Sequence, residues 1–525
     1  MQLKKTLSRD ILGFIIFFSF WFGLFIYSGS LTSGYHFIDD HQILTLTEQL
    51  KTSSVNSVIK DFYLVELHFR FRPMFNVVRV VFAFLFGSNF TFWAISFGLL
   101  GVLTSFFLFK FGTTIGFSFI QSIIFALLTL VGVQSVMWYQ YGDAENLGMF
   151  FLSISLFLLA KSIFSSKYTS IYRAGFLLSM IFSSLSKESF VIVIPAILFL
   201  QQWLYSSKNN VSLFTAIKKN ILSIIILTVV LLLEMFLIIY LIGTDPTGQT
   251  GIDNNILSMF FVRSFFYEIR HFNIFLIILF GVFLIIENII THKNSTENFL
   301  KDFLKITTFF FLLIFPQFAL YFKSGIMDRY YLPLMIGFTF YLLYLTKKIW
   351  DNFHISHFTK YLYLFLIIFF LIEEVRVNTI PYLVKNAEDS RSTNSLLNSI
   401  IQNADEDSNI IIVMDPAQYF ELCKSLIDYL KHFGDREKFS VKFTYRDHIT
   451  KIYSDSSFYK KCQERTFKMF KNILFDSLKN IDDIQCVVIF PQLEKNFLRE
   501  NNSWFDTGSY RREEFKPYSV YYKNK

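Results

Sequence analysis

The stretch PMFNVVRVVFAFLFG, residues 73–87, decides how often the chain crosses a membrane. It is apolar, but it is short and carries Arg79. A membrane-spanning helix needs about 20 apolar residues to cross about 30 Å of hydrocarbon. We therefore predict that 73–87 forms a helix that lies in the membrane interface with its apolar face buried.

Longer apolar runs occur along most of the chain. The 525 residues are 53% hydrophobic and include 69 Phe, whereas a soluble domain contains about 45–50% apolar residues. This composition excludes a large soluble protein and predicts a polytopic membrane protein. We count eleven candidate spans: 11–28, 89–110, 116–137, 146–160, 174–186, 189–204, 221–243, 272–291, 303–322, 331–346 and 361–376.

The distribution of basic residues supports this count. With the N-terminus in the cytoplasm, the predicted inner ends of the spans are rich in Lys and Arg, as the positive-inside rule requires. A span at 73–87 would invert every later loop and break the pattern. The basic residues at the inner ends are Lys4, Lys5, Arg9, Lys110, Lys161, Lys167, Arg173, Lys208, Lys218, Lys219, Lys293, Lys301, Lys305, Lys347, Lys348 and Lys360.

The last part of the chain is more polar. Two short apolar runs, 409–416 and 485–491, alternate with helix-like stretches such as 418–433, which indicates a small α/β domain. The expected fold is an all-α polytopic membrane protein with about eleven spans over 1–376 and an extracytoplasmic α/β domain over 377–525. The three Cys show no zinc-site spacing.

Two acids follow the first span in the long outer loop 29–88. Asp39 and Asp40 lie in GYHFIDDHQIL. One interpretation is a solvated loop or an N-cap for the next helix. The other is a general base, because adjacent carboxylates in a less polar environment raise one pKa. His36 and His41 would then tune the pair or bind a metal ion.

Basic residues of the same outer loop precede the interfacial helix in the motif FRFRP. Arg70 and Arg72 lie on the outer side, where the positive-inside rule does not explain them. A guanidinium grips a phosphate at two points, although both side chains could instead reach lipid headgroups.

Later outer loops add further charges. Asp143 and Glu145 follow an aromatic belt in WYQYGDAENLG, and Lys187 and Glu188 interrupt an apolar hairpin. Charges at membrane depth usually face a cavity or a partner, but Glu188 could also simply neutralise Lys187. Arg329 begins a span from the outside, where reaching a headgroup is the alternative, and Glu234 lies inside a span without an evident partner.

The order of these charges over residues 1–345 resembles the GT-C fold of membrane glycosyltransferases that use polyprenyl-phosphate sugars. The nearest likenesses are protein O-mannosyltransferases and lipid A aminoarabinose transferases. The resemblance implies that Asp39 is the catalytic base, with Asp40 as its partner. It implies that Arg72 contacts the lipid phosphate, and that Lys187 and Arg329 match later basic residues near that phosphate.

The resemblance also assigns Asp143 and Glu145 to the lining of the site, and we extend the sugar or acceptor contacts to Glu188 and His41 and the phosphate contacts to Arg70. We expect an inverting glycosyltransferase in a bacterial inner membrane, acting on a glycan, lipid or protein acceptor. We expect no nucleic acid partner, and no cofactor is required, although a divalent cation is possible. The alternatives are a polymerase or ligase for lipid-linked chains and a non-catalytic flippase, transporter or assembly protein.

Overall fold

The computed structural model describes residues 2–37, 40–67, 70–242, 282, 296–320, 328–352, 357–416, 418–445, 457–475, 484–501 and 504–524. The loop 244–271 and Asp39 lie outside the described residues, and so does the predicted span 272–291 except for one residue. The chain divides into two compact units. Unit 1 comprises Met1–Ser28, Ile59–Arg79 and Ala94–Val384, and unit 2 comprises Gly29–Val58, Val80–Trp93 and Lys385–Lys525.

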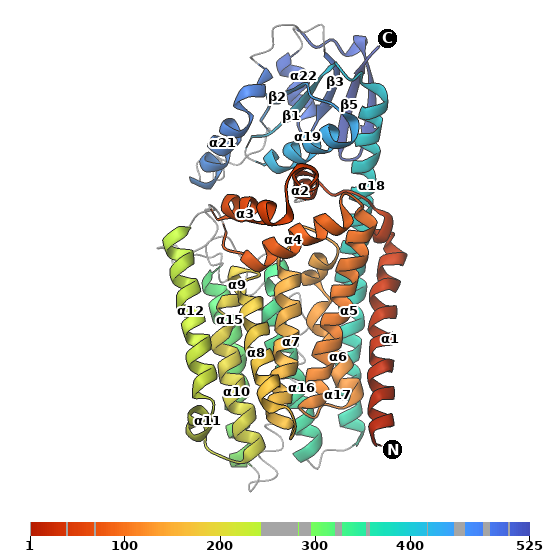
Figure 1. The fold of residues 1–525 in the computed structure, drawn as a ribbon. Helices are drawn as coiled ribbons and strands as arrows, with labels where there is room; N and C mark the ends of the chain where they lie inside the picture. Colours follow the sequence, from red (N-terminus) through yellow and green to blue (C-terminus); the bar gives the residue numbers. More distant parts are fainter. Residues whose placement is uncertain are drawn as a thin grey trace. The chain divides into compact units, whose positions relative to one another are not determined.

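Every secondary-structure element among the described residues of unit 1 is helical (Figure 1). Most predicted spans in the described part of the chain coincide with helices, but the predicted span 116–137 is only partly covered, because its helix α6 has 12 residues. Helices that unit 1 contains wholly or in part are α1 (Gln2–Ser28), α3 (Val55–Glu66), α4 (Pro73–Phe86), α5 (Phe90–Thr114), α6 (Phe119–Leu130), α7 (Glu145–Phe164), α8 (Thr169–Ser184), α9 (Glu188–Val191), α10 (Ile194–Asn209), α11 (Leu213–Lys219), α12 (Ile221–Leu241), α15 (Thr296–Leu320), α16 (Leu332–Asn352), α17 (His357–Glu373) and α18 (Ile380–Asn403).

Short helical turns join these helices. They are the 3₁₀ turns η2 (Val133–Trp138) and η3 (Asp328–Tyr331) and the π-helical turn η4 (Glu374–Thr379).

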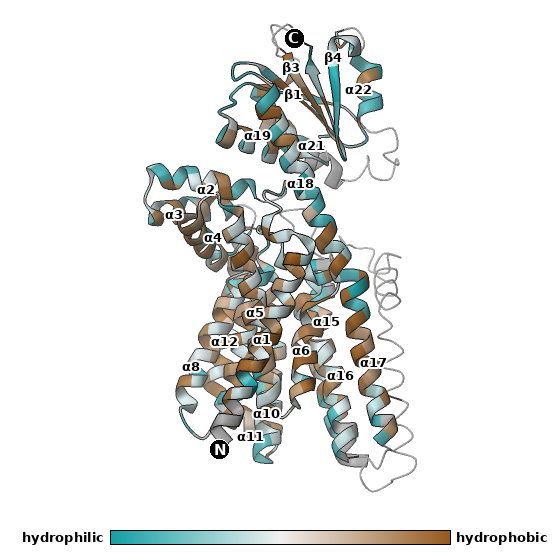
Figure 2. Ribbon diagram, turned by 90° about the vertical axis from the view of Figure 1, so that its right-hand side faces the viewer, coloured by the Kyte–Doolittle hydropathy of each residue, from teal (hydrophilic) through white to brown (hydrophobic). Residues whose placement is uncertain are grey.

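Five helical segments are long and apolar enough to cross a membrane: Leu7–Ser28, Phe90–Thr114, Glu145–Phe164, Glu188–Asn209 and Ile221–Leu241. Large apolar side chains such as Leu222, Leu232 and Phe236 on α12 are exposed, and the brown colour of α12 and α17 in Figure 2 marks their apolar character. Lipid is the environment that suits such surfaces. The chain is therefore a multi-pass membrane protein, as the composition predicts, while the number of eleven spans stays a prediction.

The contact between α1 and α5 shows how aromatic side chains hold unit 1 together. Trp21 Nε1 donates a hydrogen bond of 2.9 Å to Ser105 Oγ, and the ring of Phe17 meets that of Phe109 edge to face. Gly98 leaves room for Phe25, since a Cβ at that position would lie 2.8 Å from its ring. Helices in a bilayer associate through such close packing and through hydrogen bonds.

The stretch that begins with Pro73 forms a separate helix, α4, that ends at Phe86. Pro suits the first turn of a helix because its missing N–H would have no partner there. The helix has 14 residues, too few to cross a bilayer comfortably. Its existence and bounds agree with the prediction for 73–87, and its place in the membrane interface stays a prediction.

Unit 2 contains the small sheet that the sequence predicts near the C-terminus. The strands lie in the order β2-β1-β3-β5-β4. Strands β2, β1 and β3 are parallel, and β3, β5 and β4 are antiparallel. The strands are β1 (Asn409–Met414), β2 (Phe439–Phe443), β3 (Ile484–Ile489), β4 (Tyr510–Phe515) and β5 (Tyr518–Lys523), and the other elements include η1 (Ser30–Thr32), α2 (His41–Thr52), α19 (Phe420–Gly434), α21 (Ser457–Phe470), η5 (Lys471–Ile473), α22 (Glu494–Asn501) and η7 (Thr507–Ser509).

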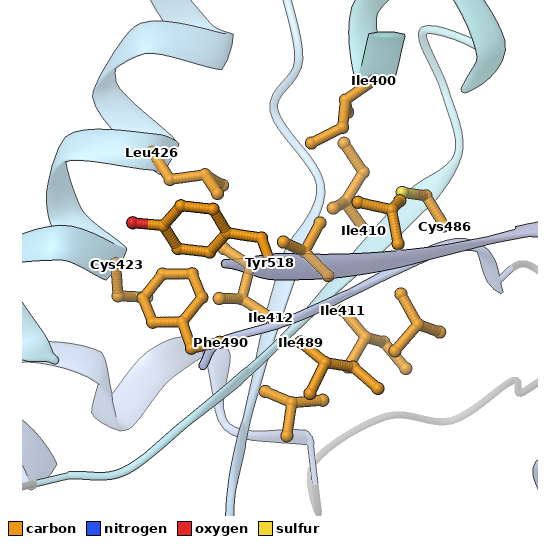
Figure 3. Packing of buried hydrophobic residues seen from close by; sticks show 14 of the residues in the cluster. Ile400, Ile410, Ile411, Ile412, Cys423, Leu426, Cys486, Ile489, Phe490 and Tyr518 are labelled. Atoms are coloured by element: carbon orange, nitrogen blue, oxygen red, sulfur yellow. The ribbon is translucent and has the colours of Figure 1, made fainter. Parts of the chain in front are cut away.

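Strand β1 runs through the centre of the core of unit 2, and all six of its residues are buried. Figure 3 shows Ile410 to Ile412 packed between neighbouring side chains of α18, α19 and β3. A parallel strand buried on both faces reads as a continuous apolar run, which explains why NIIIVM is visible in the sequence.

Unit 2 is discontinuous in sequence, whereas the sequence analysis expects one contiguous domain over 377–525. Tyr35, Phe37 and Leu44 from the outer loop belong to the same hydrophobic core as the sheet. Tyr35 also donates a hydrogen bond of 2.9 Å to the Ser425 carbonyl oxygen on α19. The segment Gly29–Val58 is therefore an integral part of unit 2.

Candidate functional site: a buried ion-pair cluster in unit 1

The FRFRP motif ends beside the start of α9. Arg72 Nε lies 3.2 Å from Glu188 Oε2, and the backbone N–H of Phe71 donates to Glu188 Oε1 over 2.8 Å. One carboxylate thus fixes both the guanidinium and the backbone of the loop. The N–H of Met74 donates to the Leu185 carbonyl oxygen, so the start of α4 is also tied to the end of α8.

Lys187 pairs with the first residue of α7. Its Nζ lies 2.9 Å from Glu145 Oε1, and both side chains are almost fully buried, with 5% and 1% exposed. Glu145 occupies a helix N-terminus, where the helix dipole favours a negative charge. The turn before α7 is held by Asn146, which donates to the Met137 carbonyl oxygen in η2.

Arg329 brings a third cation to the same carboxylates. Its Nη1 lies 2.6 Å from Asp143 Oδ1, and its Nε lies 3.8 Å from Glu145 Oε1. Arg329 lies in the 3₁₀ turn η3, immediately before α16. About a quarter of its side chain is exposed, compared with 3% of the side chain of Asp143. Arg329 is therefore the most accessible of these three cations.

These contacts define the ion-pair cluster: Arg72, Asp143, Glu145, Lys187, Glu188 and Arg329. The cluster pairs three cations with three carboxylates in the interior of unit 1. Removing one partner of a buried pair leaves an uncompensated charge, which is strongly destabilising. The carboxylates therefore hold the cations in defined positions.

The surroundings shift the pKa values of the cations in different directions. Burial lowers the pKa of Arg72, but the charges of Glu188 and Glu145 outweigh it and raise this pKa above its usual value. Burial, and then the charge of Arg72, lower the pKa of Lys187 to about 8 against the opposing charge of Glu145. Lys187 is thus the cation whose charge can change within an accessible pH range.

Arg70 is half-buried beside the ion-pair cluster, and its charge acts on both Lys187 and Glu188. Within the described part of the chain, no acidic side chain forms an ion pair with Arg70. Arg70 is therefore a cation that an incoming anion can meet without first displacing a carboxylate.

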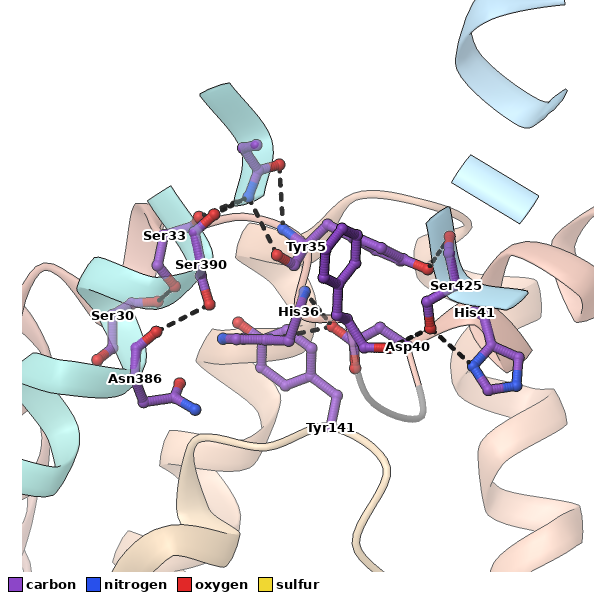
Figure 4. Close-up of polar contacts among 12 residues, drawn as sticks. Ser30, Ser33, Tyr35, His36, Asp40, His41, Tyr141, Asn386, Ser390 and Ser425 are labelled. Carbon is purple, nitrogen blue, oxygen red and sulfur yellow. Dashed lines mark hydrogen bonds and ion pairs between the residues drawn. The ribbon is translucent and has the colours of Figure 1, made fainter. Parts of the chain in front are cut away.

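The predicted site residues Asp40 and His41 belong to unit 2. Asp40 is fully buried, and its Oδ2 lies 3.0 Å from both the backbone N and Nδ1 of His36. His41 Nδ1 lies 3.0 Å from Ser425 Oγ on α19 (Figure 4). Asp39 lies outside the described residues. The structure thus brings together six of the predicted site residues in unit 1 and places Asp40 and His41 in unit 2.

Three polar contacts near the ion-pair cluster were not predicted. The charged groups of Lys187 and Arg329 lie 5.4 and 5.3 Å from the centre of the Tyr330 ring. Gln317 donates to the Ser189 carbonyl oxygen in α9. The position of Tyr330 next to Arg329, and the isolated polarity of Gln317 in an apolar run, are the signals that could have identified them.

Glu234 also has a partner that the sequence did not reveal. Ser184 Oγ at the end of α8 donates to Glu234 Oε1 over 2.8 Å. The intramembrane acid is thus hydrogen-bonded beside the hairpin that carries Lys187 and Glu188.

Among the described residues, no group of three or more His, Cys, Asp and Glu side chains is arranged to hold a metal ion. The chemistry that the ion-pair cluster itself supports is the binding of an anion by guanidinium and ammonium groups, since such groups form strong, charge-assisted hydrogen bonds with phosphate.

The sequence matches no protein-family model and no curated protein sequence. The solved structures that are similar to the chain include two of the same protein. The crystal structure of ArnT from Cupriavidus metallidurans in the apo state has a TM-score of 0.49 and 11% identity, covering 97% of this chain and 98% of that one. The structure of the same protein bound to undecaprenyl phosphate has a TM-score of 0.44 and 10% identity, covering 97% of each chain.

Proposed function

We propose that the protein is a membrane glycosyltransferase that moves a sugar from a polyprenyl-phosphate carrier to a hydroxyl acceptor on the extracytoplasmic face. The observation that carries this proposal is the ion-pair cluster at the ends of apolar helices. A lipid-linked sugar phosphate places an anionic group at the membrane boundary, and the buried, positioned cations of the cluster would meet this group.

The cations have a defined task in this reaction. As the acceptor oxygen bonds to the anomeric carbon, the bond from that carbon to the phosphate oxygen breaks, and its electron pair remains on the phosphate. Arg70, Arg72, Lys187 and Arg329 would stabilise this growing negative charge. Prepositioned charges stabilise a transition state because they need no reorganisation during the reaction. A single displacement of this kind inverts the sugar carbon.

The carboxylates of the cluster have a supporting task. Asp143, Glu145 and Glu188 hold the cations in place, and Asp143 and Glu145 would also line the site for the sugar or acceptor. This arrangement keeps the positive groups buried in the absence of substrate, because each buried charge retains a partner.

The acceptor hydroxyl must lose its proton during the attack. We assign this step to Asp39 with Asp40 as its partner, on the basis of their position in the sequence. The proton would move from the hydroxyl to the carboxylate as the new bond forms, and general base catalysis of this kind contributes typically 10²–10⁴-fold. The contact of Asp40 with His36 would fix the orientation of the second acid, and His41 is a candidate acceptor contact.

Binding of the carrier tests the phosphate part of this proposal. Arg70→Gln should weaken the binding of undecaprenyl phosphate to the purified protein about tenfold, because a hydrogen-bonded charge is lost. Lys60→Gln is the matched control, since Lys60 is exposed on α3. Equal affinities for the two variants and the parent protein would remove Arg70 from the site.

Transfer from a labelled polyprenyl-phosphate sugar tests the enzymatic part. Asp39→Asn and Asp40→Asn should each reduce transfer by two or more orders of magnitude while the protein stays folded and binds undecaprenyl phosphate. Translocation of the labelled lipid across vesicles without cleavage of the sugar–phosphate bond would identify a flippase instead.

A further inference from the structure

A second charged site lies at the other end of the unit 1 helices. A pocket of about 590 Å³ is formed by the N-terminal part of α1, the C-terminal ends of α5 and α7, and the start of α6. Arg9, Asp10, Lys110 and Lys161 line it together with hydroxyl-bearing residues such as Ser118 and Ser166. Pockets of this size accommodate small molecules and headgroups.

The pocket is separate from the ion-pair cluster. Glu145 begins α7 and Phe164 ends it, and the rise of about 1.5 Å per residue separates the two ends by roughly 28 Å. That distance is close to the hydrocarbon thickness of a bilayer, about 30 Å. The two sites therefore meet opposite membrane faces, and the proposed glycosyl transfer does not account for the pocket.

Charge in the pocket is unbalanced. Three cationic side chains and one anionic side chain line it, which leaves two positive charges in excess. Lys110 Nζ lies 2.5 Å from Asp10 Oδ2. Within the part of the chain that the structure describes, neither Arg9 nor Lys161 forms an ion pair with an acid. The pocket can therefore take up a negatively charged group.

Two of the cations differ from basic residues that merely mark the cytoplasmic face. Only 15% of the Lys110 side chain is exposed, and Lys161 is half-buried, with its ammonium 5.8 Å from the centre of the Phe157 ring. A residue that serves the positive-inside rule alone needs no enclosure. Here the cations line a cavity whose other walls include Phe109 and Phe119.

We propose that this pocket binds a phosphate group presented by an anionic phospholipid of the adjoining leaflet. Basic pockets between membrane helices on the cytoplasmic side suit anionic headgroups, because the leaflet concentrates these lipids next to the protein. The cations and hydroxyls would meet the phosphate, while the aromatic wall would contact the start of the acyl chains.

Titration of the full-length protein in detergent with dioleoyl phosphatidylglycerol tests the proposal, with lipid retention measured by native mass spectrometry and the melting temperature as a second readout. Lys161→Gln should weaken binding about fivefold, the contribution of one basic residue near an anionic surface. Asp10→Asn should strengthen binding by a similar factor, because it removes the competing anion. Lys219→Gln, on α11 at the same end of the helices (Figure 1), should leave affinity unchanged.

Two further titrations identify what is recognised. Dioleoyl phosphatidylcholine should bind more weakly and show no dependence on the variants, and inorganic phosphate should compete with phosphatidylglycerol in the parent protein. Equal affinities for the two lipids, or an unchanged affinity in both Lys161→Gln and Asp10→Asn, would overturn the proposal. A response of the variants to inorganic phosphate but not to phosphatidylglycerol would overturn the lipid as the source while retaining the phosphate site.

Discussion

Lys187 and Glu188 are neighbours in the chain, yet each forms its ion pair with a different residue. Glu188 binds Arg72, and Lys187 binds Glu145. The two charges also attract each other, but the ion pairs that they form are with Arg72 and Glu145. Each carboxylate instead joins segments that are more than forty residues apart in the sequence, so the two charges at this hairpin organise the site around them.

The pair of Arg72 and Glu188 should respond differently to single and double substitution. Arg72→Gln should lower the free energy of unfolding by about 3–5 kcal/mol, because Glu188 would remain buried without its partner. Arg72→Gln combined with Glu188→Gln should recover much of this loss. Thermal unfolding of the purified variants measures the effect, and a double variant less stable than Arg72→Gln alone would contradict it.

The pKa of Lys187 predicts how the transfer activity depends on pH. Its pKa lies near 8, so the ammonium is present below this pH and is lost as the pH rises through it. Transfer should therefore decline above pH 8 if the cation stabilises the departing phosphate. Lys187→Arg should move this decline to a higher pH, because arginine stays protonated. The measurement is kcat/KM across pH 6–10, and identical profiles would exclude Lys187 as the titrating group.

At the scale of elements, local patterns and long-range contacts differ in how well the sequence reveals them. The run that starts at Pro73 and the strand-like NIIIVM were both predicted close to their observed bounds, because apolar length, helix-start signals and hydrophobic runs are local properties. The contact of Phe71 and Arg72 with Glu188 was not predicted. Arg72 and Glu188 are 116 residues apart, and no local periodicity connects segments at that separation.

The packing of α7 against α9 is another long-range contact that the sequence does not reveal, and it depends on Gly148. A Cβ at Gly148 would lie 2.9 Å from the Phe190 ring, one turn from Glu145. Gly148→Val should push α9 away, loosen the pair of Glu145 and Lys187, and reduce transfer at least tenfold. Gly23→Ala is the control, because no atom lies within 4 Å of its added Cβ. Parent-like transfer by Gly148→Val would show that this spacing is unimportant.

At the scale of the whole molecule, the sequence predicted a membrane part and a small C-terminal sheet but not how the first outer loop is used. The grouping of Asp39 and Asp40 with the other site charges was inferred from their order along the chain. That grouping stays a prediction, and the structure adds that Tyr35 and Phe37 belong to the core of unit 2. A single sequence carries no local signal for packing between segments more than 350 residues apart.

The shared core makes a prediction for truncation. A chain that ends at residue 384 would lack the sheet and α19, and Tyr35, Phe37 and Leu44 would lose the core in which they are buried. Brief trypsin treatment should then cut the truncated chain at Lys51, while the full-length protein resists. Equal resistance of both proteins would show that Gly29–Val58 is ordered without the C-terminal residues.

The discontinuity of unit 2 also has a consequence during translation. The ribosome makes Gly29–Val58 before the helices from α6 to α17, whereas it makes strands β3, β4 and β5 after them. Until those strands are made, Tyr35, Phe37 and Leu44 lack the core in which they are buried. We expect such a chain to benefit from a holding chaperone, and a pause in synthesis before β3 should prolong the exposure of these residues to proteases.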